Sequence, residues 1–148
     1  MLIEDIMTKE VISVNLSTKI TEVANLLHEK RIHALPVVDG GKKVIGIIAE
    51  TDFFLKELSN AYLPAYIQYN KRAGGAESTE EEKKVAEKVA GTEAKDIMTA
   101  NPVTIKADAK ISEAMTIIKE KNFFSLPVVD DDGVLVGIIT IADIIKLI

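Results

Sequence analysis

The feature that most constrains the fold of this chain is an internal repeat. When the 148-residue sequence is shifted by 91 positions, residues 4–57 align with residues 95–148 without a gap. Of the 54 aligned pairs, 18 are identical, which is far more than chance would give. A repeat of this kind indicates one structural unit that is used twice and packs against its own copy.

The identities between the two repeats gather in short motifs. DIMT, LPVVD and GII occur once in each repeat, and an aspartate follows the last of them. Their positions are 5–8 and 96–99, 35–39 and 126–130, 46–48 and 137–139, and Asp52 and Asp143. A run as apolar as the one ending at Ile139 is typical of a strand buried on both faces, so Thr140 and Asp143 are polar groups at the end of a buried strand.

Hydrophobic spacing predicts the same order of elements in each repeat. A short apolar strand over 11–14 or 103–105 comes first, followed by a helix with Ser17 or Asp108 as its N-cap. The helix is indicated by an apolar stripe of Ile20, Val23, Ala24 and Leu27, repeated by Ile111, Ala114, Met115 and Ile118. Two strands joined by a hairpin turn follow, and a second helix that begins near Asp52 or Asp143 completes the unit. The predicted fold is α/β (α+β), with the order β-α-β-β-α used twice.

Neither repeat is expected to fold alone, because each has about 55 residues and a sheet that needs cover on both faces. Packing the two units about a pseudo-twofold axis solves this problem and creates two equivalent clefts between them. The predicted domains are therefore unit 1 over 1–57, a connector over 58–92 and unit 2 over 93–148.

The connector has no counterpart in the repeats and is predicted to be helical with interruptions. Residues Leu58, Ala61, Tyr62, Ala65, Tyr66 and Tyr69 have helical spacing, but Pro64 should break or restart that helix. A loop is expected over 71–76. A second helix should begin with a capping box of Ser78 and Glu81 and end at Gly91. We expect this connector to cover a cleft or to contact a partner.

Composition excludes several classes of protein. The sequence is 47% hydrophobic, which argues against disorder, and it has no cysteine, which excludes disulfides and thiolate chemistry. The net charge is −5 and aromatic residues make up only 5%, so neither a basic face nor a base-stacking platform for nucleic acid is present. Without a signal peptide or a long apolar span, a cytoplasmic protein with no membrane partner is expected.

The motifs resemble those of a CBS-domain pair, also called a Bateman module. DIMT, LPVVD and a G-h-h-T-x-x-D pattern, in which h is apolar, carry the resemblance, and it covers about 108 of the 148 residues. It implies a stand-alone module that binds AMP, ADP, ATP or S-adenosylmethionine between its two units. It also implies a homodimer that regulates an unknown protein partner, with no catalytic residues and no metal.

The resemblance assigns a main ligand site to one of the two clefts. An ionised carboxylate at Asp143 can accept hydrogen bonds from both ribose hydroxyls, and Thr140 can reach a phosphate or ribose oxygen. Apolar side chains would hold the adenine while their backbone groups read its edge, and His33 would point to phosphate or base. No dense cluster of cations converges on this cleft, and Arg31 and His33 are the nearest candidates by sequence. AMP or ADP is therefore favoured over ATP. The predicted main site comprises Thr8, Ile12, Ile32, His33, Ile138, Thr140 and Asp143.

The second cleft departs from this pattern. Ala49 replaces the hydroxyl of Thr140, and Thr51 can substitute for it only in part. Phe124 stands in the place of His33, where it either stacks on adenine or fills the pocket. We expect a weaker, different or unused second site that comprises Ile47, Thr51, Asp52, Thr99, Val103, Phe123 and Phe124.

Other interpretations of the same residues stay open at this point. Asp52 and Asp143 can act as helix N-caps without any ligand. The protein can be a dimeric scaffold whose clefts no longer bind, or, least favoured, a nucleotide hydrolase, although no nucleophile–base pair or P-loop is visible. The acidic run 130–133 lacks the later glutamate of an EF-hand, so a turn is favoured over a calcium site.

Overall fold

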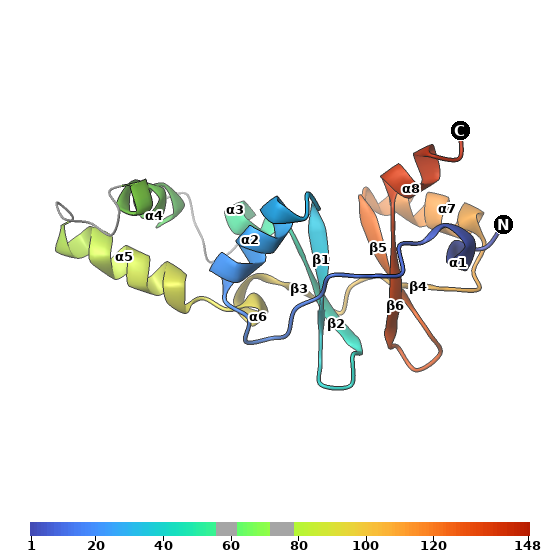
Figure 1. Cartoon of the computed structure of the whole chain (residues 1–148), viewed down its shortest axis with the longest axis horizontal. Coiled ribbons are helices and arrows are strands. Elements are labelled where there is room, and N and C mark those ends of the chain that lie inside the picture. Colours follow the sequence, from blue (N-terminus) through green and yellow to red (C-terminus); the bar gives the residue numbers. More distant parts are fainter. Residues whose placement is uncertain (56–61, 72–78) are drawn as a thin grey trace.

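A computed structural model covers the chain and describes residues 1–55, 62–71 and 79–148. Predictions that fall on 56–61 and 72–78, including Leu58, Ala61 and most of the loop over 71–76, lie outside the described residues. Figure 1 shows two β-hairpins side by side, with helices on the outer side of each.

The first repeat has the predicted helix and hairpin. It contains α1 (Ile3–Ile6), α2 (Ile20–Glu29), β1 (Ala34–Val38), β2 (Val44–Ala49) and α3 (Asp52–Leu55). Of the apolar stripe predicted for α2, Ile20, Val23 and Leu27 are buried in the core, whereas Ala24 is exposed. The predicted strand over 11–14 is reduced to one bridge, between Val14 and β1.

The second repeat has the corresponding elements in the same order, with two additional short strands, β3 and β4, after its first helix. It contains α6 (Ala94–Ile97), β3 (Thr99–Ala100), β4 (Ile105–Lys106), α7 (Ile111–Lys121), β5 (Ser125–Val129), β6 (Leu135–Thr140) and α8 (Ile141–Ile145). The strand predicted over 103–105 begins two residues later than expected. The prediction that Ser17 and Asp108 cap the first helix of each repeat is wrong. The caps are Lys19 and Lys110, and neither side chain makes a capping hydrogen bond.

The described residues form two three-stranded sheets, and each sheet borrows backbone from the other repeat. One sheet has the order β1-β2-β3, so β3 of the second repeat pairs with the first hairpin. The other has the order β4-β5-β6, and Thr8 of the first repeat pairs with β6. The two hairpins are antiparallel, and β4 is parallel to β5.

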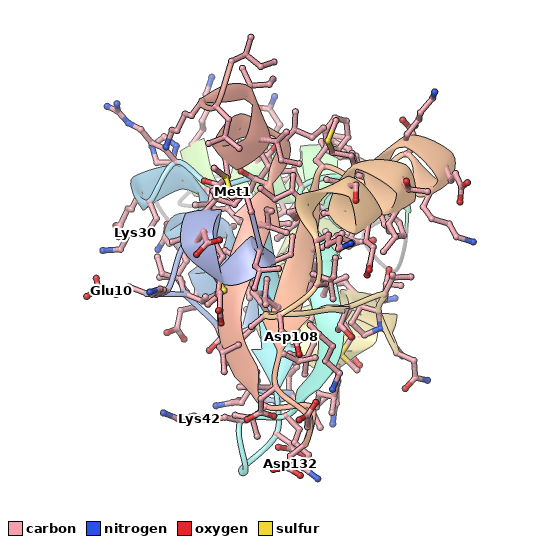
Figure 2. The ribbon with its side chains drawn as sticks, turned by 90° about the vertical axis from the view of Figure 1, so that its right-hand side faces the viewer. Met1, Glu10, Lys30, Lys42, Asp108 and Asp132 are labelled. Carbon is pink, nitrogen blue, oxygen red and sulfur yellow. The ribbon has the colours of Figure 1, made fainter. Side chains whose placement is uncertain are left out.

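The predicted pseudo-twofold axis is visible in the backbone pairs between the hairpins. Val44 N–H donates to the Gly133 carbonyl at 3.1 Å, and Leu135 N–H donates to the Lys42 carbonyl at 2.9 Å. Adding 91 to one residue number and subtracting it from the other converts the first pair into the second. Figure 2 shows Lys42 and Asp132 at the end of the molecule where the hairpins meet.

The short helix at the start of each repeat packs into the core of the other repeat. Ile3 of α1 is fully buried among core residues of the second repeat, and its N–H donates to the Ala109 carbonyl at 2.9 Å. In the symmetric arrangement, Ala94 and Ile97 of α6 are buried in the first core, and Ala94 N–H donates to Thr18. The boundaries 1–57, 58–92 and 93–148 stay predictions, and each core draws one helix from the opposite repeat.

The connector packs on the first repeat. It contains α4 (Tyr62–Lys71) and α5 (Glu80–Gly91), which pack on each other, and α5 also contacts α2. Pro64 lies in the first turn of α4, where the missing N–H costs no helical bond. Val89 is buried in the first core, and Val85 and Tyr66 pack against that core.

The capping of α5 differs from the prediction by one residue. The cap is Thr79, whose Oγ1 accepts from the N–H of Glu82 at 3.1 Å, so Glu81 is not at the third helical position. The run of three glutamates supplies an acidic residue three positions after either hydroxyl, so the sequence pattern fits both starts. The prediction that α5 ends at Gly91 is confirmed.

The methionine of each DIMT motif explains the glycine of each GII motif. Gly137 of β6 lies under Met7, and Gly46 of β2 lies under Met98. A Cβ atom at Gly137 would collide with the Met7 Sδ and come within 3.1 Å of the Thr8 carbonyl oxygen. The absence of a side chain at these glycines is therefore what allows the opposite repeat to approach.

We expect Gly137→Ala to destabilise the protein by about 1–3 kcal/mol, the usual cost of forcing extra volume into a packed site. Its melting temperature should fall by about 2–4 °C for each kcal/mol. Adding Met7→Ala should recover part of the loss, so the double variant should cost less than the sum of the single changes. Gly40→Ala is the control, because nothing lies within 4 Å of its Cβ position. Equal melting temperatures for Gly137→Ala and Gly40→Ala would contradict the close approach.

Candidate ligand-binding clefts

Two segments of the chain cross from one sheet to the other, and each carries predicted site residues. Thr8 is paired with β6 and Val14 with β1, so the half-buried Ile12 lies on a segment that passes between the sheets. In the symmetric segment, 99–105, Val103 has the same place and is 38% exposed. The two crossing segments are therefore related by the pseudo-twofold axis, but Ile12 and Val103 are differently exposed.

Strand β6 separates core residues from predicted site residues. Gly137 and Ile139 are buried, whereas Ile138 and Thr140 are only half-buried. Because side chains alternate along a strand, Ile138 and Thr140 share the face opposite to Ile139. This alternation brings two of the predicted main-site residues to one surface, with Asp143 at the end of the strand.

Thr140 and Asp143 hold each other in a reciprocal cap at the start of α8. Asp143 Oδ2 accepts from the Thr140 N–H at 2.8 Å and from the Thr140 hydroxyl at 3.0 Å. In return, Thr140 Oγ1 accepts from the Asp143 N–H at 3.2 Å. This capping box orients the carboxylate and engages Oδ2, so Oδ1 is the oxygen through which Asp143 can accept from ribose hydroxyls.

The same capping geometry occurs at four aspartates, so capping alone does not mark a ligand site. Asp5, Asp52 and Asp96 each accept, through Oδ2, from the N–H three residues earlier, at 2.7, 2.8 and 2.8 Å. Asp143 differs because its partner also supplies a hydroxyl. Asp52 is 7% exposed and its partner is Ala49, which has no hydroxyl. The interpretation of Asp143 as the N-cap is wrong, because the N-cap of α8 is Thr140 and Asp143 is its capping-box partner. Both cleft aspartates nevertheless accept a hydrogen bond from the N–H three residues earlier.

The backbone of Ile138, which is predicted to read the adenine edge, pairs with Thr8, so its N–H is unavailable to a base and only the second lone pair of its carbonyl stays a candidate. Its N–H donates to the Thr8 carbonyl at 3.0 Å, and its carbonyl accepts from the Thr8 N–H at 2.9 Å. Both groups are used in joining the first repeat to β6. Ile32 also has its N–H engaged, with the Leu27 carbonyl at 3.1 Å, so only its carbonyl stays a candidate for base recognition.

His33 has a partner that the sequence analysis did not identify. Its Nδ1 lies 3.3 Å from Oε2 of Glu50, and the His33 side chain is 82% exposed. The backbone supports the pair, because Glu50 N–H donates to the His33 carbonyl at 3.0 Å. An imidazole in this place can approach an anionic ligand from solvent.

The second cleft replaces this polar pair with an apolar one. Ile141 N–H donates to the Phe124 carbonyl at 3.1 Å, which reproduces the backbone bond of the first repeat. Phe124 is 68% exposed and Phe123 is 37% exposed, so neither is a core residue. A comparison of the repeats could have found Glu50. The alignment places His33 opposite Phe124 and Glu50 opposite Ile141, so the first repeat has two polar residues where the second has two apolar ones.

The remaining residues of the second site lie where the symmetry requires. Ile47 pairs with Thr99, as Ile138 pairs with Thr8. Thr51 is exposed in the turn before α3, and its carbonyl accepts from the N–H of Phe54. Within the described ranges, no three His, Cys, Asp or Glu side chains come together as a metal site would require.

Comparison with protein families identifies both repeats. The model of the CBS domain matches residues 3–58 and 94–148, which together make up most of the chain. This chain belongs to the CBS-domain family. Two curated relatives match along almost their whole length. The uncharacterized protein MJ1426 of Methanocaldococcus jannaschii is 34% identical, and the match covers 99% of this chain and 90% of that protein. The CBS domain-containing protein DDB_G0289609 of Dictyostelium discoideum is 31% identical over the same shares.

Solved CBS-domain pairs share the fold. The crystal structure of CBSX2 in complex with AMP, a protein of Arabidopsis thaliana, matches with a TM-score of 0.72 and 27% identity. The match covers 99% of this chain and 94% of that one. The CBS domain pair of protein MJ0100 in complex with 5′-methylthioadenosine and S-adenosyl-L-methionine matches with a TM-score of 0.68 and 27% identity, over the same shares. The predicted fold class is therefore confirmed.

We expect Asp143→Ala to cost about 1 kcal/mol of stability, because it removes the acceptor of the Thr140 N–H. Asp143→Asn should cost less, since its amide oxygen can still accept that bond. Thermal unfolding monitored by circular dichroism measures both. Asp132→Ala, at an exposed hairpin tip, is the control and should stay within about 0.5 kcal/mol of wild type. If Asp143→Ala were as stable as Asp132→Ala, the cap would contribute nothing.

Proposed function

We propose that this CBS-domain pair is a regulatory module that binds an adenosine-containing ligand, AMP, ADP, ATP or S-adenosylmethionine, and acts on a protein partner. The observation that carries the proposal is the orientation of Asp143. Its Oδ2 is held by Thr140, which turns Oδ1 into a preorganised acceptor for two adjacent ribose hydroxyls.

The ligands of solved relatives support this class of ligand. CBSX2 was crystallised with AMP, and MJ0100 with 5′-methylthioadenosine and S-adenosyl-L-methionine. These molecules differ in charge and in the substituent at the 5′ position, and they share adenine and ribose. An acceptor for ribose hydroxyls together with apolar walls fits the shared part. The proposed main site therefore comprises Thr8, Ile12, Ile32, His33, Ile138, Thr140 and Asp143.

The two clefts are proposed to differ in affinity and preference. The main cleft offers the exposed imidazole of His33 to an anionic group, whereas the second offers the exposed ring of Phe124. The second cleft also lacks the hydroxyl that Thr140 contributes. Its proposed residues, Ile47, Thr51, Asp52, Thr99, Val103, Phe123 and Phe124, therefore favour a ligand with less negative charge than the main cleft.

Ligand binding in the main cleft would act on the joint between the repeats. Thr8 and Ile138 come from different repeats and are joined by two backbone hydrogen bonds. A ligand that touches both would change the relative stability of the arrangements that the repeats can adopt. It shifts their populations only to the extent that it binds one arrangement more tightly. The regulated partner senses that shift.

We propose that the protein is not an enzyme and that it acts in the cytoplasm. No helix of the described residues is long and apolar enough to cross a membrane. The alternative of a scaffold with unused clefts draws on Ala49 and on the two phenylalanines of the second cleft. It predicts a stable dimer that no adenosine compound affects.

The test is a thermal-shift panel with AMP, ADP, ATP, S-adenosylmethionine and GTP. A ligand at about 100 times its Kd should add about 2.7 kcal/mol to the stability of the folded protein, a rise of several degrees. Asp143→Asn should abolish the rise, because it keeps the cap and removes the charged acceptor. Asp52→Asn is the matched control and should leave the tightest response in place. A flat panel in protein that melts cooperatively would refute the proposed function.

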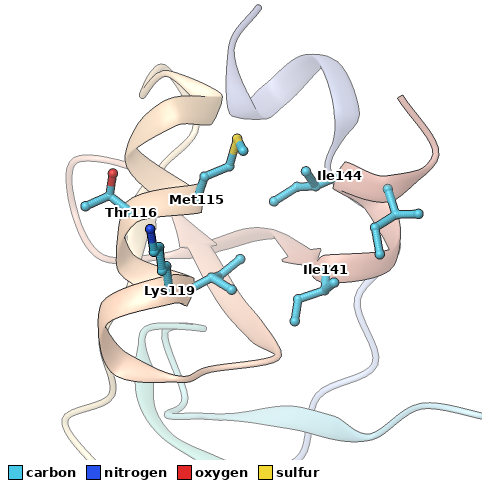
Figure 3. Close-up of a pocket in the computed structure, with 7 residues that line it drawn as sticks. Met115, Thr116, Lys119, Ile141 and Ile144 are labelled. Atoms are coloured by element: carbon cyan, nitrogen blue, oxygen red, sulfur yellow. The ribbon is translucent and has the colours of Figure 1, made fainter. Parts of the chain in front are cut away.

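We further propose a homodimer that forms through the outer face of the second repeat. Helices α7 and α8 border a groove of about 350 Å³ whose lining includes Met115, Ile118 and Ile144 (Figure 3). Met115 is 52% exposed and Ile145 is 58% exposed. Leu27, the counterpart of Ile118, is only 6% exposed, in the repeat where α5 packs on α2. A second copy would give the α7–α8 face the cover that the first repeat obtains from the connector.

Met115→Glu should weaken the dimer by at least about tenfold, because it places a charge in an apolar interface. Sedimentation velocity over a range of concentrations measures the change. Ile67→Glu is the control, since Ile67 is 49% exposed but lies on α4 of the connector. A wild-type protein that stays monomeric at every concentration would remove the dimer from the proposed function and leave ligand binding untouched.

A further inference from the structure

A second cavity lies outside both ligand clefts, in the first repeat. It has a volume of about 680 Å³ and is lined by the segment 13–18, by Glu22 and Leu26 of α2, and by four hairpin residues, Val38, Asp39, Gly40 and Lys42. None of the residues assigned to the main or the second cleft lines it. Its walls are therefore independent of the proposed adenosine sites.

The second repeat shows what belongs in this place. There the side chain of Lys106 crosses from β4 to the hairpin, and its ammonium donates to the Asp130 carbonyl at 2.7 Å. The same ammonium lies 3.5 Å from a carboxylate oxygen of Asp131. A primary ammonium group with its methylene chain thus bridges the segment and the hairpin in the second repeat.

The first repeat has Asn15 at the position equivalent to Lys106, and Asn15 does not make this bridge. Its Oδ1 accepts from the Ser17 N–H at 3.0 Å, the Ser17 hydroxyl at 2.9 Å and the Thr18 hydroxyl at 3.2 Å. These bonds fold the amide back on its own segment. The Asn15 amide therefore does not reach across the cavity to the hairpin as Lys106 does in the second repeat.

The acceptor for an ammonium group is retained in the first repeat. The Asp130 carbonyl accepts from the Gly133 N–H at 3.1 Å as well as from Lys106, and a carbonyl oxygen has two lone pairs. The equivalent Asp39 carbonyl accepts from the Lys42 N–H at 3.0 Å. Its second lone pair corresponds to the one that Lys106 uses in the other repeat.

The charge and apolar surface of the cavity suit an alkylammonium group. Glu22 and Asp39 contribute carboxylates, and Asp39 holds its own turn by accepting from two backbone N–H groups. Lys42 is the opposing cation, and its side chain lies at the exposed hairpin tip. Leu26 and Val38 line the cavity as apolar side chains and can pack along methylene groups.

From this internal comparison, we propose that the cavity of the first repeat binds a primary alkylammonium group, in the place that Lys106 occupies in the second repeat. The group would donate to the Asp39 carbonyl and approach the Glu22 carboxylate, with its carbon chain on Leu26. A free polyamine and a lysine side chain of a protein partner present the same chemistry.

The experiment is an amide NMR titration of the intact protein with n-butylamine, which matches the end of a lysine side chain. Wild type should show saturable shifts confined to residues 13–18 and 38–42. Asn15→Lys supplies the missing ammonium from within, so it should reduce the affinity by at least about tenfold and raise the melting temperature. Asn70→Lys makes the same charge change on α4 and should bind n-butylamine as wild type does. The reverse variant, Lys106→Asn, should create a second set of saturable shifts around residues 130–133.

Two outcomes would overturn the proposal. One is equal n-butylamine affinity in wild type and Asn15→Lys, and the other is the same shifts with n-butanol, which has no charge. If Asn15→Lys fails to fold, Lys106→Asn decides alone, because the proposal requires a second site to appear. Spermidine and Nα-acetyl-lysine amide then distinguish the source, since the tighter of the two identifies a polyamine or a lysine of a partner. None of these results depends on whether adenosine ligands bind.

Discussion

The structure depends on backbone pairing between the segment that follows the first helix of each repeat and the last strand of the opposite repeat. Thr8 exchanges two hydrogen bonds with Ile138, and this pairing places Met7 over Gly137. Neither repeat can complete its sheet or its core without the other, because α1 and α6 are buried in the opposite cores. In a fold built in this way, a ligand that binds beside these backbone pairs can contact both repeats at once.

This constraint also determines which groups are available for function. The N–H of Ile138 is engaged by the pairing with Thr8, and Oδ2 of Asp143 is engaged by the cap on α8. What stays available is the second carboxylate oxygen and the half-buried side chains beside it. Asp143 therefore combines a structural role with a proposed binding role, since one carboxylate oxygen can hold the helix start while the other accepts from a ligand.

The differences between the repeats matter more for function than their identities. The identical residues, such as those of DIMT and GII, build the joint and the cores in both halves. Where the repeats differ, the two sides of the molecule have different surfaces. His33 with Glu50 corresponds to Phe124 with Ile141, and Asn15 corresponds to Lys106. At each of these positions, which are equivalent by symmetry, the two repeats therefore have side chains of different polarity or charge.

The sequence by itself determined the repeat, the order of elements, the family and the residues at the strand ends, because hydrophobic period and motif spacing are local properties. It could not show that α1 and α6 each pack in the core of the opposite repeat, because such contacts join residues far apart in sequence, such as Ile3 with Ala109 and Ala94 with Thr18. Only the tertiary structure decided that the Ile138 N–H is engaged by Thr8 and that Glu50 lies beside His33. The hydrogen-bond partners of Asn15 and Lys106 were likewise decided by the tertiary structure, since they depend on which groups the fold brings within reach of each side chain.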